Sequence, residues 1–414
     1  MLCAACETVV DDGWNTSRLC PACHVISGAP LPSLASTGSP LWLWTSPSAS
    51  PALASGNLAV IIKAYRHTAQ VTQSALASAL GYDTTYISMI ENGRRVITDV
   101  PTLRRVAHHL GLPPHVLGVT DPADADFISM IKFGESTIRL ASVARESGHS
   151  AEAINELWPL VWRLEARLAQ GRADRAAAQL LGQARAMLGV ALGDVLPEES
   201  LAAAARWTGR ALLIAHRLDD VALLARALRV HGNELRKIGK KPAAAARLQR
   251  ASDIAPASER GAVLIPLART LAELGNAEHF DNAIIDLRRF VDSHHGTPLV
   301  NPFVLREVHL RGLLATGRLQ EATRLAEADT PDAAGVAPQW QTIERVTVAE
   351  VFRATGDRAA ASQALLQSIA TAESTRLPHQ IQRAMRAARG ALPEIEEAGA
   401  AALQRLYLTL PAAQ

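Results

Sequence analysis

The four cysteines of this 414-residue chain all lie within its first 23 residues, as the pairs Cys3-x-x-Cys6 and Cys20-x-x-Cys23. A Cys-x-x-Cys pair forms a tight turn that points two thiolates at one ion, and a second pair completes the tetrahedral shell that Zn²⁺ prefers. Two disulfides or four free thiols are the alternatives. A reducing cytoplasm disfavours the disulfides, and the absence of cysteine elsewhere in the chain disfavours free thiols. We therefore expect these four residues to bind one zinc ion.

A shell of four thiolates leaves no position for water or substrate, so the expected zinc site is structural. His24 follows Cys23 directly and could replace a cysteine as ligand, but we interpret it as a bystander. Residues 1–24 resemble a small zinc ribbon. That resemblance implies a metal and says nothing of the partner.

A second group of residues with chemical potential lies in the run GYDTTYISMIENGRR, residues 81–95. At 100° per residue, a helix over 84–92 buries Ile87 and Ile90. The opposite arc, about 140° wide, is uncharged and small, and it holds Thr84, Thr85, Ser88, Met89 and Asn92. A helix that presents such a face after a three- to four-residue turn is typical of the helix that enters the DNA major groove.

Neighbouring patterns predict four further helices that position this one between Leu58 and Val119. An amphipathic helix begins at Leu58, and a second is capped by Thr72 and stopped by Gly81. Asp83 caps the helix of interest, Pro101 starts a fourth, and LPPHVLGV forms a short fifth.

The run VTQSALASALGYDTTYISMIENGRR, residues 71–95, resembles the helix-turn-helix of lambda-repressor-like (XRE) regulators. The resemblance covers about 60 residues, and it implies an ion pair between Arg66 and Glu91. It also implies phosphate contacts from Gln73, Asn92, Arg94 and Arg95, and base contacts from Thr84, Thr85 and Met89. A helical hairpin that does not touch DNA is the alternative.

Elementary chemistry agrees with these implied roles. Gln73 lies at a helix N-terminus, where free N–H groups attract a phosphate, and Arg94 and Arg95 supply a salt-sensitive attraction. Specificity would come from Thr84, Thr85, Ser88 and Met89, whose methyl groups suit a thymine methyl better than a guanine edge. The Gln or Arg that the family often carries on this face is missing, so the target sequence cannot be predicted.

Composition and charge favour an all-α protein with a DNA-binding segment. Aromatic residues make up only 4% of the chain, Ala and Leu abound, and β-branched runs are scarce. Residues 57–120 carry six basic and three acidic side chains, a modest positive charge that is compatible with DNA. No apolar run is long enough to span a membrane, and the N-terminus lacks a signal-peptide pattern, so we expect a cytoplasmic, nucleoid-associated protein.

Residues 25–56 are rich in Pro, Ser and Ala, a composition that predicts a flexible linker. Within it, the run LWLW contains Trp42 and Trp44. A tryptophan side chain is rarely exposed in a linker unless it contacts something. Docking of this segment onto the chain's own helices is one interpretation, and binding of a partner is the other.

The remainder, residues 126–414, predicts an α-solenoid. Ala205, Ala244, Ala283, Ala322 and Ala361 are spaced by 39 residues, and Gly317 and Gly356 share a turn position. The segments 228–256 and 140–160 resemble tetratricopeptide motifs, although that family's usual period is shorter. Such an array binds peptides or proteins on its concave side, or it serves only for dimerisation.

Together these patterns predict an all-α protein with a zinc ribbon (1–24), a linker (25–56), a five-helix helix-turn-helix domain (57–120) and a tetratricopeptide-like array (126–414). We expect a bacterial transcription regulator that binds double-stranded DNA as a homodimer and senses a peptide, protein or small-molecule effector. The alternative is an adaptor in which the ribbon and the array recruit partners and DNA binding is secondary. No HExxH, GxSxG or GxxxxGK[ST] motif occurs, so an enzyme is not expected.

Protein purified without added metal should contain one Zn²⁺ per chain, and Cys20→Ser should release it because three thiolates hold zinc less tightly than four. Elemental analysis measures both. Full zinc occupancy in the Cys20→Ser variant would contradict the four-cysteine site.

Overall fold

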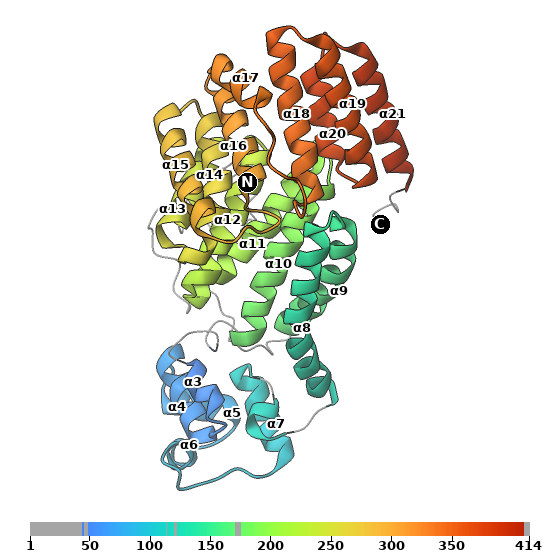
Figure 1. Cartoon of the computed structure of the whole chain (residues 1–414). Helices are drawn as coiled ribbons and strands as arrows, with labels where there is room; N and C mark the ends of the chain where they lie inside the picture. The colour runs from blue at the N-terminus through green and yellow to red at the C-terminus, as the bar shows by residue number, and fades with distance from the viewer. Residues whose placement is uncertain (1–43, 45–48, 113, 120–121, 170–174, 410–414) are drawn as a thin grey trace.

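A computed structural model describes residues 44, 49–112, 114–119, 122–169 and 175–409 of the chain. These residues form nineteen α-helices and no strand, so the predicted all-α class, a helix-turn-helix domain followed by a helical array, is confirmed. The helix-turn-helix domain lies at one end of the array (Figure 1). Within the described ranges, no helix has both the length and the hydropathy of a bilayer-spanning segment.

The N-terminal domain consists of short helices around one apolar core. Its helices are α3 (Ser50–Ala54), α4 (Leu58–Ala69), α5 (Gln73–Leu80), α6 (Thr84–Glu91) and α7 (Val100–Leu110), followed by a 3₁₀ turn over Pro114–Leu117. The predicted caps are present: the Thr72 hydroxyl accepts a hydrogen bond from the Ala75 amide at 3.1 Å, and the Asp83 carboxylate accepts one from the Tyr86 amide at 2.7 Å. Gly81 ends α5 in the left-handed conformation.

Trp44 extends this domain beyond the predicted boundary. Its ring is fully buried, stacks on Tyr65 with 6.2 Å between ring centroids, and donates from Nε1 to the Leu110 carbonyl at 2.6 Å. That carbonyl lies in the last turn of α7, where no helical amide is available to it. Ala49 and Leu53 are buried in the same core.

The predicted linker is therefore wrong for its last part. Residues 50–54 form α3, and Trp44 docks onto the chain's own helices because its apolar ring and its N–H both find partners there. Trp42 and the zinc-ribbon residues 1–24 lie outside the described residues.

The array consists of seven stacked helical hairpins (Figure 1). They are α8 (Pro122–Glu146) with α9 (Ser150–Ala169), α10 (Arg175–Val195) with α11 (Ala202–Leu218), α12 (Val221–Lys237) with α13 (Lys241–Ile254), α14 (Arg260–Glu273) with α15 (Ala277–Ser293), α16 (Pro302–Ala315) with α17 (Leu319–Glu327), α18 (Pro338–Thr355) with α19 (Arg358–Ser374), and α20 (Pro378–Ala388) with α21 (Pro393–Thr409).

Most of these hairpins share one turn. A left-handed glycine ends the first helix, and in five hairpins the next residue donates its amide to the carbonyl five positions earlier, at 2.8–3.0 Å. The residue five positions after this glycine starts the buried side of the second helix. It is fully buried in six hairpins, as Ala153, Ala244, Phe280, Ala322, Ala361 and Ile395.

The spacing of the turns corrects the predicted 39-residue period. Gly239, Gly275, Gly317 and Gly356 are 36, 42 and 39 residues apart, so the repeats differ in length. Phe280, and not Ala283, therefore corresponds to Ala244 and Ala322. Ala283 lies three residues further on, almost one helical turn away. Because Ala283 is buried as well, the alanines appear to repeat every 39 residues although the turns do not.

Phe280 is a large residue in a position that is alanine in four other hairpins, and a glycine makes room for it. A Cβ atom at Gly312 on α16 would lie 2.1 Å from the Phe280 ring, far inside contact distance. The two residues therefore form a complementary pair between neighbouring hairpins.

The array curves until its ends meet. The Gln382 side chain of α20 accepts a hydrogen bond from the Glu198 amide at 2.8 Å and donates one to the Glu199 carboxylate at 3.0 Å. Arg386 pairs with Glu198, and the Gly148 turn of the first hairpin lies against Pro338 of α18. The seventh hairpin thus returns to the second and closes the superhelix (Figure 1).

The effect of Gly312→Ala on the stability of the array should change sign when Phe280 is replaced by alanine. Gly312→Ala should destabilise the array by about 1–3 kcal/mol because the new methyl group overlaps the ring. In a Phe280→Ala background the same change should stabilise by up to about 1 kcal/mol, because alanine is the better helix former. Urea unfolding of the four proteins measures both values. An equal cost in the two backgrounds would show that the residues are not coupled.

Candidate nucleic-acid interface

The α6 helix presents the face that the sequence predicts. Ile87 and Ile90 are buried in the domain core, whereas Thr84 and Thr85 are exposed and Ser88 and Met89 are partly exposed. Only three residues, 81–83, connect α5 to α6, so the two helices form a compact helix-turn-helix. The four predicted base-facing side chains thus share one accessible surface.

The buried carboxylate of Glu91 fixes the orientation of α6. Its side chain is 2% exposed and forms a bidentate ion pair with Arg66 of α4, with 3.0 Å between Nη2 and Oε2. The Gln73 amide, in the first turn of α5, donates to the same carboxylate at 2.6 Å, and Arg66 also donates to the Val71 carbonyl at 3.2 Å. One carboxylate therefore connects three helices, and the predicted Arg66–Glu91 pair is present.

The pKa of Glu91 reflects these contacts. Burial alone would raise its pKa, but the hydrogen bonds from Arg66 and Gln73 and the Arg66 charge together lower it below the ordinary value. The pair also raises the pKa of Arg66. Glu91 is thus ionised at neutral pH although it is buried.

The predicted phosphate-contacting residues lie at two ends of the motif. Gln73 is partly exposed at the N-terminus of α5, and its amide is already bonded to Glu91. Asn92, Arg94 and Arg95 are exposed just after α6. The chain turns there because Gly93 is left-handed and the amides of Arg94 and Arg95 donate to the Met89 carbonyl at 2.8 and 3.2 Å.

An aromatic stack beside α6 was not predicted from the sequence. The rings of Tyr82 and Tyr86 are 4.6 Å apart, the Arg105 guanidinium lies 5.4 Å from the Tyr82 ring, and that of Arg95 lies 5.8 Å from Tyr86. Arg105 also donates to the Tyr82 hydroxyl at 2.7 Å. The stack holds two cations beside the α6 face. The i, i+4 spacing of the two tyrosines could have predicted their contact. No sequence pattern predicts that Arg105 lies beside them.

A protein-family model described as "Helix-turn-helix domain" matches residues 57–117. These residues are a helix-turn-helix domain. No curated protein matches the chain.

Two solved structures are similar to the chain at low identity. One is the crystal structure of Bacillus thuringiensis PlcR in complex with the peptide PapR7 and DNA, at 13% identity and a TM-score of 0.24, covering 84% of this chain and 99% of that one. The other is a circular tandem repeat protein with novel repeat topology and enhanced subunit contact surfaces, at 15% identity and a TM-score of 0.20, covering 89% and 95%.

The buried carboxylate gives a prediction for acid stability. Because the pKa of Glu91 is lowered in the folded domain, its stabilising effect is complete above the unfolded pKa of about 4.3 and is lost as pH falls through the folded value. Glu91→Gln should cost about 1–3 kcal/mol at pH 7 and should weaken this acid sensitivity. Urea titrations at pH 7, 5 and 4, followed by hydrogen-exchange protection of amides 58–110, test it. Identical pH profiles for both proteins would contradict this role of Glu91.

Proposed function

We propose that the chain is a transcription regulator whose α6 helix reads DNA in the major groove. The accessible α6 face, with Thr84, Thr85, Ser88 and Met89 held outward by the buried Glu91, is the observation that carries the proposal. A helix with small polar and apolar side chains fits this groove, and methyl groups suit thymine. Gln73, Asn92, Arg94 and Arg95 are proposed to contact phosphates on either side.

The cysteine-containing segment and the helical array support the DNA-binding domain in this proposal. Cys3, Cys6, Cys20 and Cys23 hold a structural Zn²⁺, and the α-solenoid senses an effector and holds two chains together. The site of action is the bacterial nucleoid. The subtype proposed for the DNA-binding domain is lambda-repressor-like (XRE), on the strength of residues 71–95.

An apolar stripe on α8 supports dimerisation. Phe133 and Leu140 are seven residues apart on one side of this helix and are 69% and 68% exposed, and Val143 nearby is 61% exposed. Exposed apolar residues of this size mark protein interfaces when they cluster. The helix follows the DNA-binding domain directly, so a pair of α8 helices would hold two recognition helices at a fixed separation, as two half-sites require.

DNA binding predicts two classes of variant. Arg94→Ala and Arg95→Ala should weaken binding to every duplex and should each reduce the slope of log affinity against log salt by about one, because each loses a phosphate contact. Thr85→Ala and Met89→Ala should instead relax the preference at one base pair by about 1–3 kcal/mol. Titrations of a selected site and a random duplex at several salt concentrations separate the classes.

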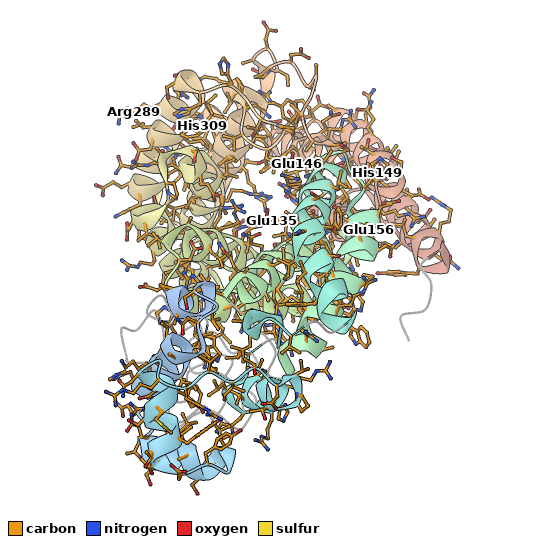
Figure 2. All side chains as sticks on the ribbon, turned by 90° about the horizontal axis from the view of Figure 1, so that it is seen from below. Glu135, Glu146, His149, Glu156, Arg289 and His309 are labelled. Atoms are coloured by element: carbon orange, nitrogen blue, oxygen red, sulfur yellow. The ribbon has the colours of Figure 1, made fainter. Side chains whose placement is uncertain are left out.

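Arg289→Ala is the matched control for the arginine variants. Its side chain is 77% exposed on α15 and lies at the outer edge of the array, away from the DNA-binding domain (Figure 2). This change should leave affinity and salt slope as in the wild type. Equal losses on both duplexes for Thr85 and Met89 would show that α6 does not read bases, and a flat salt dependence would favour the adaptor function instead.

The α8 stripe predicts the oligomeric state. The wild type should sediment as a dimer at micromolar concentration, and the double variant Phe133→Glu, Leu140→Glu should sediment as a monomer, because the stripe cannot bury four carboxylates. Leu366→Glu, another exposed leucine on α19, is the control. A dimeric double variant would place the interface elsewhere, and a monomeric wild type, also when bound to DNA, would refute dimerisation.

A further inference from the structure

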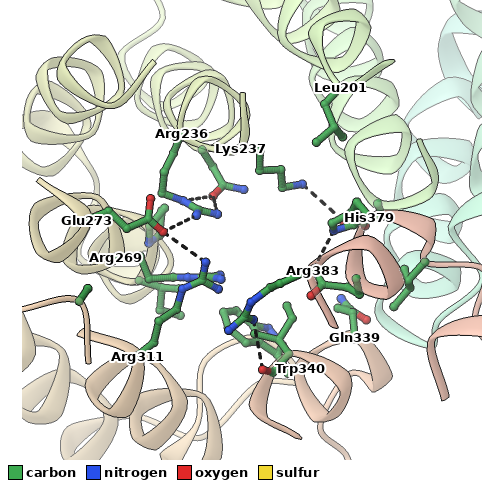
Figure 3. Close-up of a pocket in the computed structure, with 18 of the residues that line it drawn as sticks. Leu201, Arg236, Lys237, Arg269, Glu273, Arg311, Gln339, Trp340, His379 and Arg383 are labelled. Atoms are coloured by element: carbon green, nitrogen blue, oxygen red, sulfur yellow. Dashed lines mark hydrogen bonds and ion pairs between the residues drawn. The ribbon is translucent and has the colours of Figure 1, made fainter. Parts of the chain in front are cut away.

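The closed superhelix surrounds a cavity of about 730 Å³. The first helices of all seven hairpins contribute at least one polar or charged residue to its wall, part of which is drawn in Figure 3. This volume falls within the range of sites that enclose a small molecule. The α20 contacts with Glu198 and Glu199 close the ring, so an extended chain would have to thread into the interior.

The cavity wall has an excess of positive charge. Ten arginine and lysine side chains line it against four aspartate and glutamate side chains, a surplus of six. Each of the four acids already has a basic partner: Asp194 pairs with Arg145 and Lys237, Glu198 with Arg386, Glu273 with Arg236 and Arg311, and Glu350 with Arg383. The four lining carboxylates therefore form no ion pair with Arg229, Lys241, Arg269 or Arg353.

Arg269 of α14 is the clearest case. The residue is 7% exposed, its guanidinium lies 5.3 Å from the centre of the Trp340 ring, and its buried Nε has no hydrogen-bond partner among the described residues. It points into the same interior as Arg311 and Arg383 (Figure 3). A buried guanidinium N–H without an acceptor is costly, and an anionic ligand would supply that acceptor.

Other lining groups also lack partners. Arg229 Nε, Gln339 Oε1 and Gln380 Oε1 are buried and have no hydrogen-bond partner among the described residues. Native proteins leave few such groups unsatisfied, and several around one cavity indicate a bound molecule with both acceptors and donors.

The electrostatics of the wall point the same way. Burial, together with the charges of neighbouring arginines, lowers the pKa of Arg311 to about 10 and that of Arg269 well below its ordinary value. Glu273 and Glu307 offset this effect only in part. A bound anion would relieve the repulsion among these guanidinium groups.

We propose that this cavity binds one small organic anion with phosphate or carboxylate groups, held by Arg269 and Arg311, with its less polar part against Trp340 and Ile343. Guanidinium groups bind both kinds of oxyanion through paired N–H donors. Anion binding at this site does not depend on DNA binding by α6, so either can fail without the other.

The test uses the full chain and isothermal titration calorimetry at low ionic strength with pyrophosphate, ADP, citrate and penta-glutamate. At least one of the first three should bind with one molecule per chain, and the comparison of pyrophosphate and ADP with citrate distinguishes a phosphate from a carboxylate ligand. Arg269→Gln should weaken that binding at least tenfold. Arg289→Gln, on the outer surface, should leave it unchanged.

A second readout separates a binding role of Arg269 from a structural one. In buffer free of these anions, Arg269→Gln should raise the unfolding temperature, because it removes a buried charge that has no acceptor. Its affinity for DNA should equal that of the wild type. Arg353→Gln, an exposed lining residue, provides a variant that does not disturb the packing and should weaken anion binding about threefold.

Three results would overturn the proposal. They are the absence of binding by pyrophosphate, ADP and citrate alike, unchanged anion affinity in the Arg269→Gln variant, and tighter binding of penta-glutamate than of all three small anions. The last result would assign the cavity to an acidic peptide.

Discussion

The helix-turn-helix domain depends on one buried negative charge. Glu91 ends α6 inside the domain, where an ionised carboxylate is stable only with partners, and it finds them on two other helices in Arg66 and Gln73. Because each partner comes from a different helix, satisfying the charge also sets the angles between the helices. The contacts of Glu91 therefore fix the orientation of the α6 face as much as the apolar core around Ile87 and Ile90 does.

The array follows from a different constraint, the repeated turn. A left-handed glycine ends the first helix of a hairpin, and a buried residue five positions later, alanine in four hairpins, packs the second helix against its neighbours. Repetition of this unit gives a constant direction of curvature, and seven hairpins suffice for the array to meet itself. The first helices of all seven hairpins then contribute to a common interior, which concentrates their arginines in one cavity.

Local features of this fold can be predicted from sequence, and distant contacts cannot. The caps Thr72 and Asp83, the outward face of α6 and the Arg66–Glu91 pair follow from short-range patterns or from the family resemblance. Trp44 lies in a stretch rich in Pro and Ser whose composition indicates a linker, so composition does not predict its burial. The contacts of Gln382 with Glu198 and Glu199 join residues about 180 positions apart, and no local pattern encodes them.

Closure of the superhelix also bears on how the chain folds. In an open array each hairpin touches only its neighbours, so folding can begin anywhere and spread, and a lost terminal repeat costs little. Here the seventh hairpin is synthesised after the second and completes a contact with it. The ring, and the cavity inside it, can therefore form only after synthesis of α20, and an insertion or deletion of one repeat would leave the two ends out of register.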